Sequence, residues 1–350
     1  MHIGRREVGA GQPAFIVAEL SANHGQSLDV ALQSVRAAAE AGADAIKLQT
    51  YTPETMTLRS LAPRFMVQNG LPGGGRSLFE LYAEAQTPWE WHLPLKAEAE
   101  SCGLAFFSTA FDQTSVEFLA KLDVCALKIA SFELVDLPLI ATAARVGKPL
   151  ILSTGMANLG EIEDAVTAAR AAGARDLVLL RCTSAYPAPA ESMRLRQIPW
   201  LRDMFGVTVG LSDHTRGVGA AAAAVVLGAS LIEKHFILSR EIGGQDADFS
   251  LTPAEFRTLV TTVREVEAAL SRDHFEELES ERPARQYRRS LWAICDIAEG
   301  ERLTAVNVRS LRPAAGLAPK HWAEVLCCRA AVPIVAGTPI DWSLLKRDNP

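Results

Sequence analysis

The chain has 350 residues, of which 49% are hydrophobic and 22% are charged, and its formal net charge is −6. This length suits one large domain and a small one, and the apolar share is enough for a sizeable core. The negative balance argues against a nucleic-acid or anionic-membrane surface, although a few buried Lys or Arg side chains can make one pocket positive. The N-terminal segment lacks the apolar stretch of a secretory signal, and the longest Ala-rich run, 219–228, is about half of what crosses a bilayer. We therefore expect a cytoplasmic protein with neither a nucleic-acid nor a membrane partner.

Short apolar runs recur along the first part of the chain, and Ala-rich stretches of helical periodicity connect them. The eight runs are 15–18, 45–48, 104–107, 126–129, 150–152, 177–180, 207–211 and 231–232. This alternation predicts a buried parallel sheet. Eight β/α units over about 250 residues predict a (β/α)8 TIM barrel. An open doubly wound sheet is the alternative, but no G-x-G-x-x-G follows any run, which disfavours dinucleotide binding.

The β/α pattern is interrupted once and ends before the C-terminus. An insertion at 52–86 includes the Gly-rich piece 72–75, and we expect it to form a lid or loop over the barrel mouth. We assign residues 1–280 to the barrel, the charged stretch 281–289 to a linker, and 290–350 to a small β-rich domain. A domain this small is marginal alone, so it should pack on the barrel or on a partner subunit.

Polar side chains follow the runs at the strand ends, where TIM barrels place their active sites. Lys47 and Lys128 stand within apolar sequence, where burial without a partner is costly. Several other runs are followed by hydroxyl groups, those of Thr109, Ser131, Ser153, Ser184 and Ser212. Two cations and several hydroxyls are typical of a site for a phosphorylated, carboxylated small molecule. The alternatives are structural ion pairs with a carboxylate such as Glu19, or a Schiff-base aldolase lysine.

Two histidines, His214 and His235, end the last two runs, so their imidazoles can converge over one part of the mouth. A carboxylate such as Asp246, water and substrate oxygens would complete the shell of a hard divalent ion better than a closed zinc site. Such an ion would polarise a carbonyl group as a Lewis acid. Glu19 and Glu133 are further candidates, either as a base or as lysine partners, and Tyr186 is either a core aromatic or a site hydroxyl.

At these residues the chain resembles the sialic acid synthase family, over nearly its whole length. The matching segments are AELSANH (18–24), ADAIKLQT (43–50), KIASFE (128–133), LSTG (152–155), CTSAYP (182–187), GLSDHT (210–215) and EKHF (233–236). The tail from residue 290 resembles the antifreeze-like (SAF) domain that ends these proteins. Within the family, ELSANH resembles the pseudaminic acid synthases, with N-acetylneuraminate and legionaminate synthases as alternatives and a metal-dependent aldolase as a distant one.

The resemblance implies a transferase that condenses phosphoenolpyruvate with 2,4-diacetamido-2,4,6-trideoxy-L-altrose, giving a nine-carbon 2-keto sugar acid and phosphate. It assigns the phosphoenolpyruvate pocket to Lys47, Thr109, Lys128, Ser153, Ser184 and Ser212. It also implies that His214 and His235 bind a divalent metal, Mn2+ with Mg2+ or Co2+ as alternatives, and that Glu19 lies near the reacting carbons.

The resemblance further implies how the sugar is bound and how subunits assemble. Glu133 and Tyr186 match positions on the sugar side. Arg312 matches a tail arginine that reaches the sugar of the other subunit, which implies a domain-swapped homodimer.

Overall fold

The structure is a computed structural model that describes residues 1–67, 74–270, 275 and 277–347. It consists of two compact units, Met1–Arg272 and Asp273–Pro350, each of which is described by itself. Residues 72 and 73 of the Gly-rich piece in the expected lid lie outside the described residues.

The first unit is a closed barrel of parallel strands, as predicted, and each of the eight apolar runs forms one of its strands. The strands are β3 (Phe15–Glu19), β4 (Ala45–Thr50), β5 (Ala105–Ala110), β6 (Leu127–Ile129), β7 (Leu150–Ser153), β8 (Leu177–Cys182), β9 (Thr208–Asp213) and β10 (Leu231–His235). They pair in chain order, and β10 pairs with β3 to close the ring. This closure excludes the open sheet.

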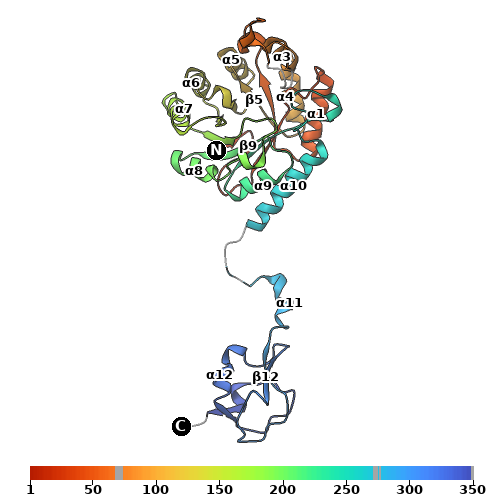
Figure 1. Cartoon of the computed structure of the whole chain (residues 1–350), viewed down its shortest axis with the longest axis vertical. Helices are drawn as coiled ribbons and strands as arrows, with labels where there is room; N and C mark the ends of the chain where they lie inside the picture. Colours follow the sequence, from red (N-terminus) through yellow and green to blue (C-terminus); the bar gives the residue numbers. More distant parts are fainter. Residues whose placement is uncertain (68–73, 271–274, 276, 348–350) are drawn as a thin grey trace. The chain divides into compact units, whose positions relative to one another are not determined.

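Helices surround the barrel strands (Figure 1). They are α1 (Leu28–Glu40), α4 (His92–Ser101), α5 (Gln113–Lys121), α6 (Leu137–Arg145), α7 (Leu159–Ala171), α8 (Gln197–Phe205), α9 (Gly219–Val226) and α10 (Pro253–Leu270). Local sequence sets their ends, as α1 illustrates. Ser27 caps its start by accepting a hydrogen bond from the Val30 N–H, and Gly42, with φ +93°, follows its last turn. The apolar faces of strands and helices form one core around the ring.

The described part of the insertion between β4 and α4 forms short helices. It contains α2 (Pro53–Met56), η1 (Pro63–Phe65) and α3 (Leu78–Ala85). Ser77 and Glu80 form a reciprocal capping box that fixes the start of α3. An N-terminal hairpin, β1 (His2–Ile3) with β2 (Arg6–Glu7), was not predicted, because two-residue strands leave no periodic pattern.

The second unit is small and β-rich, as predicted. Its strands are β11 (Ser290–Ala293), β12 (Val308–Leu311), β13 (Cys328–Ala330) and β14 (Leu345–Arg347), and its helices are η6 (Glu279–Glu281), α11 (Arg282–Arg285), η7 (Pro319–His321), α12 (Trp322–Val325) and η8 (Trp342–Leu344). It has an apolar core of its own, which includes Leu291, Leu303 and Ile340. Among the described residues, no helix has the length and apolar character needed to cross a bilayer.

Candidate active site

The barrel strands continue past their apolar runs into polar residues, and these residues gather at one end of the barrel. Glu19 is the last residue of β3, Ser153 the last of β7, and His235 the last of β10. Strand pairing requires only the backbone, so the ladder extends beyond the last apolar side chain. The carboxyl ends of all eight strands meet at the same end of a parallel barrel, and polar side chains placed there share one mouth.

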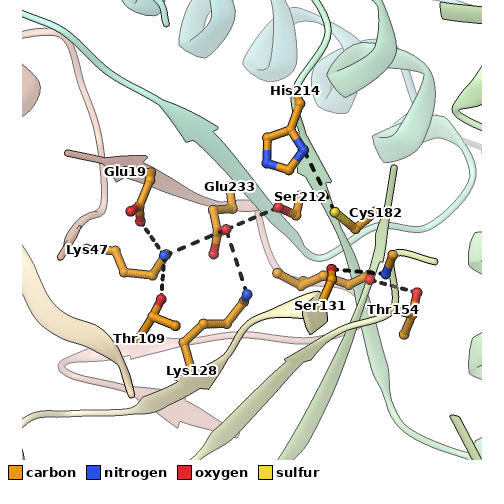
Figure 2. Close-up of polar contacts among 12 residues, drawn as sticks. Glu19, Lys47, Thr109, Lys128, Ser131, Thr154, Cys182, Ser212, His214 and Glu233 are labelled. Carbon is orange, nitrogen blue, oxygen red and sulfur yellow. Dashed lines mark hydrogen bonds and ion pairs between the residues drawn. The ribbon is translucent and has the colours of Figure 1, made fainter. Parts of the chain in front are cut away.

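Glu233 lies at the centre of a buried cluster of charges. Its Oε1 is 3.8 Å from Nζ of Lys47 and 3.9 Å from Nζ of Lys128, and it accepts a hydrogen bond of 3.1 Å from Ser212. Figure 2 shows both lysines directed at this carboxylate. Lys47 also forms an ion pair with Glu19 and donates to Thr109 Oγ1 at 2.8 Å. Lys47 therefore has the close carboxylate partner that a structural ion pair requires. Within the described part of the chain, the carboxylate contact of Lys128 is the longer one to Glu233.

The buried cluster shifts the proton affinities of its members in different directions. Burial raises the pKa of Glu19 to about 7, although Lys47 opposes the rise. Burial also lowers the pKa of Lys128. For Lys47 burial acts to lower the pKa, but the charges of Glu19 and Glu233 outweigh it and the pKa rises. Burial would raise the pKa of Glu233, but Lys128 and Lys47 hold it below its usual value. Glu233 is thus the charged partner of both lysines, and Glu19 is the carboxyl group that can exchange a proton near neutral pH.

Beside this cluster, the hydroxyl groups of two serines lie against Gly155. The Gly155 N–H donates to Ser131 Oγ at 3.0 Å. A Cβ on Gly155 would clash with Ser184 Oγ and Ser131 Oγ, so a side chain at this position would have to displace them. Ser153 Oγ is buried and has no hydrogen-bond partner among the described residues. Unpaired buried hydroxyls are rare and costly, so Ser153 and the neighbouring serines are candidates for binding an anionic oxygen group.

The two histidines lie side by side at the ends of β9 and β10, with ring centroids 5.2 Å apart. His214 Nδ1 is 2.9 Å from the Thr183 carbonyl oxygen; as a donor there it leaves Nε2 free to bind a ligand. His235 Nδ1 is buried, forms no hydrogen bond with any residue that the structure describes, and lies 3.5 Å from Asp246 Oδ2. Burial and the neighbouring His214 hold the pKa of His235 well below its usual value, so its ring is neutral.

These imidazoles fit a divalent ion as two donors of an incomplete shell. The described residues contain no group of three or more His, Cys, Asp or Glu side chains arranged to hold a metal ion. Water or substrate oxygens would therefore have to supply the remaining ligands, as in an open catalytic site.

Three further residues were predicted for the site: Tyr186, Glu133 and Arg312. The Tyr186 ring is 4.4 Å from the His214 ring, centroid to centroid, and is partly exposed. Glu133 follows β6, and burial raises its pKa to about 7. Arg312 follows β12 in the second unit, so its role stays a prediction.

Glu233 follows the last apolar run in the sequence but was assigned no role in the site, although strand geometry offered a signal for one. Side chains two residues apart in a strand point to the same face, so His235 and Glu233 face the same side of β10. Cys182 also follows a run and was assigned no role: its Sγ lies 3.9 Å from His214 Nδ1.

Fold and site together define a TIM-barrel enzyme whose ionisable groups are gathered at the carboxyl ends of the strands. The NeuB family profile matches residues 34–274, and the SAF domain profile matches residues 288–346. The chain belongs to the NeuB family and carries a C-terminal SAF domain.

Individual relatives agree with this membership. A "Pseudaminic acid synthase" from Campylobacter jejuni is 45% identical, with 92% of this chain and 94% of the relative covered. An "N,N'-diacetyllegionaminic acid synthase" from Legionella pneumophila is 34% identical, with 98% of each chain covered. The crystal structure of an "N-acetylneuraminic acid (Sialic acid) synthetase" from Leptospira borgpetersenii in complex with citrate is 31% identical and superposes with a TM-score of 0.72, covering 81% of this chain and 94% of that one.

Proposed function

We propose that this protein is a pseudaminic acid synthase, which condenses phosphoenolpyruvate with 2,4-diacetamido-2,4,6-trideoxy-L-altrose to give pseudaminic acid and phosphate. The observation that carries the proposal is the convergence of Lys47 and Lys128 on one buried carboxylate at the strand ends. The 45% identity to a pseudaminic acid synthase supports this sugar acid over the legionaminate product named for a relative at 34%.

Phosphoenolpyruvate needs cations for its phosphate and carboxylate and hydroxyl or N–H donors for the remaining oxygens. Lys128 is the better placed cation, since its Nζ makes no close contact with a described carboxylate. Lys47 would exchange its ion pair with Glu19 for one with the substrate. The remaining contacts would come from Thr109, Ser131, Ser153, Ser184 and Ser212. The serine hydroxyls around Gly155 are the best candidates for the phosphate, because the buried Ser153 hydroxyl has no partner among the described residues.

A divalent ion, Mn2+ with Mg2+ or Co2+ as alternatives, would be held by His214 and His235, with Asp246 beside them. When bound, it would polarise the aldehyde of the open-chain sugar. The neutral imidazole of His235, whose Nδ1 has no hydrogen bond to the described residues, supports this assignment.

In the proposed reaction, C3 of phosphoenolpyruvate forms a bond to the aldehyde carbon of the sugar. Water adds at C2, and the C2–O bond to phosphate then breaks, so that phosphate leaves and the 2-keto acid remains. Glu19 is the group proposed to transfer protons, because its pKa of about 7 lets it exchange a proton near neutral pH. The lysines stabilise the negative charges of the substrate throughout.

Glu133 and Tyr186 are proposed to contact the sugar, and Arg312 to reach the sugar of a partner subunit in a domain-swapped homodimer. The enzyme is proposed to act in the cytoplasm, where phosphoenolpyruvate is available.

A substrate panel tests the proposal. Purified protein is offered phosphoenolpyruvate with the precursor sugar of pseudaminic acid, of legionaminic acid or of N-acetylneuraminic acid, and phosphate release is measured across several divalent ions and with a chelator. We expect release with the first sugar and its loss with the chelator. Release with only one of the other sugars would reassign the product. Trapping of a lysine imine by borohydride with pyruvate would instead indicate an aldolase.

A further inference from the structure

Arg181 is a buried cation that has no carboxylate partner in the part of the chain that the structure describes. It precedes Cys182 in β8, so its side chain points to the opposite face of the strand, toward the helices. Arg181 is only 7% exposed. Its Nη2 donates to Thr183 Oγ1 at 2.9 Å and to the Ser192 carbonyl oxygen at 3.2 Å, but its Nε is buried without a partner. Among the described residues, no carboxylate lies within 4.0 Å of this guanidinium. A buried charge of this kind is costly unless something neutralises it.

The guanidinium borders a cavity of about 730 Å³ between α7 and α8. Arg194, on the loop before α8, lines the same cavity, and its charge adds to burial in lowering the pKa of Arg181. The N-terminus of α7 also faces the cavity: its cap Asn158 and its first residue Leu159 are part of the lining. The N–H groups of a first helical turn favour an anion, and here Asn158 and Glu161 cap two of them, which leaves the others of this turn for a ligand. Glu191 is the one carboxylate-bearing residue among the cavity's described lining, and it is exposed.

Apolar side chains of both helices also line the cavity and are open to solvent. Trp200 and Met204 of α8 are 60% and 54% exposed, although both line the cavity. Leu159 is 51% exposed on the opposite side. An aromatic ring beside two guanidinium groups and a helix N-terminus is suited to a ligand with a charged end and a flat apolar end.

We propose that this cavity binds a small organic anion, a phosphate or carboxylate joined to an aromatic or apolar body, at a site distinct from the reaction centre. The two sites share a wall, because Thr183 and Ser184 also line the cavity. The Thr183 carbonyl oxygen accepts from His214, and Ser184 flanks Gly155. Occupancy of the cavity would therefore act on the loop that holds two parts of the reaction centre, as a regulatory ligand does.

The proposal is tested by measuring the binding of phenyl phosphate to the full chain by calorimetry. Phenol and inorganic phosphate are the control probes, since phenol lacks the anionic half of the ligand and inorganic phosphate lacks the aromatic half. Met204→Glu places a carboxylate at the cavity from an exposed position, and Met204→Gln is its uncharged match. Lys128→Gln removes a cation from the reaction centre alone. We expect phenyl phosphate to bind more tightly than either partial probe, and Met204→Glu to weaken it by about tenfold or more, as expected for a lost charge-assisted contact. Met204→Gln and Lys128→Gln should retain this binding.

Two results would overturn the proposal. One is binding that Lys128→Gln abolishes and Met204→Glu leaves intact, which would locate the probe in the reaction centre. The other is the absence of measurable binding to the unaltered chain. Arg194→Gln, an exposed change, gives an independent check and should weaken binding in the same direction as Met204→Glu.

Discussion

Lys234 and Asp213 form an ion pair in which neither side chain has any solvent exposure, with Nζ 2.8 Å from Oδ2. They lie on the neighbouring strands β10 and β9. Each precedes one of the two site histidines in sequence. Asp213 also accepts from the N–H and hydroxyl of Thr215, and Lys234 donates to the Thr215 carbonyl oxygen. Through these contacts to Thr215, the ion pair holds the turn that carries His214 in place.

Breaking this pair is expected to destabilise the barrel. Lys234→Met leaves the Asp213 carboxylate buried without its cation, and such losses cost about 3–5 kcal/mol. Lys148→Met is the matched control, because Lys148 pairs with Asp123 at a similar distance, 2.7 Å, but on the surface. Thermal unfolding should show a large drop in Tm for Lys234→Met and little change for the control. Equal effects of the two changes would contradict the structural role given to the buried pair.

Gly155→Ala is expected to weaken phosphoenolpyruvate binding. The added methyl group would meet Ser184 Oγ and Ser131 Oγ at distances that require one of them to move. If these hydroxyls bind the phosphate, KM for phosphoenolpyruvate should rise by about tenfold or more, since charge-assisted hydrogen bonds contribute about 1.5–3 kcal/mol each. Gly219→Ala is the control, because nothing lies within 4 Å of its Cβ position. An unchanged KM in Gly155→Ala would contradict phosphate binding by the hydroxyls beside Gly155.

The affinity for phosphoenolpyruvate is expected to fall as pH rises above 7. Burial raises the pKa of Glu19 to about 7, so this group is neutral below that pH and negatively charged above it. A charged Glu19 competes with the substrate for Lys47 and repels it, so the Kd should increase by up to about tenfold per pH unit above the pKa. The phosphate of the substrate titrates near pH 6 and does not contribute in this range.

Glu19→Gln separates this effect from the titration of Lys128, whose pKa burial lowers. Measured without the sugar, so that no turnover occurs, the Kd of the variant should depend much less on pH above 7. A slope equal to that of the unaltered chain would assign the titration to another group.

His235→Ala is expected to abolish stabilisation by divalent ions. A divalent ion at a concentration of about 100 times its Kd raises the free energy of unfolding by about 2.7 kcal/mol, which is visible as a higher Tm. The variant should lose both this Mn2+-dependent rise and turnover, whereas His2→Ala, an exposed histidine of β1, should retain both. An unchanged Mn2+-dependent rise in Tm in His235→Ala would contradict the assignment of His235 as a metal ligand.

The barrel was predictable because its strands are buried on both faces and therefore appear in the sequence as apolar runs. The predicted runs were shorter than the strands at their carboxyl ends. β10 continues from the predicted 231–232 to His235, and β8 continues to Cys182. Pairing with neighbouring strands, which a single segment does not reveal, carries these polar residues into the ladder.

The polar groups of the mouth were predictable as a set, because barrel geometry brings strand ends together. Their pairings were not. Glu233 became the common partner of Lys47 and Lys128, and Lys47 also pairs with Glu19, because these side chains come from strands whose register and tilt decide which atoms meet. Arg181 follows an apolar run, as the other strand-end residues do, but its role was not predictable, since it depends on the absence of a nearby carboxylate among the described residues.

A crystal structure of the protein with phosphoenolpyruvate and Mn2+ would decide whether the two strand lysines bind the substrate beside a histidine-bound metal. We expect Nζ of Lys47 and of Lys128 to contact the oxygens of the bound substrate, with an anomalous Mn2+ peak at His214 and His235 in the same mouth. Substrate bound away from both lysines, or a metal peak remote from the two imidazoles, would be incompatible with the proposed site.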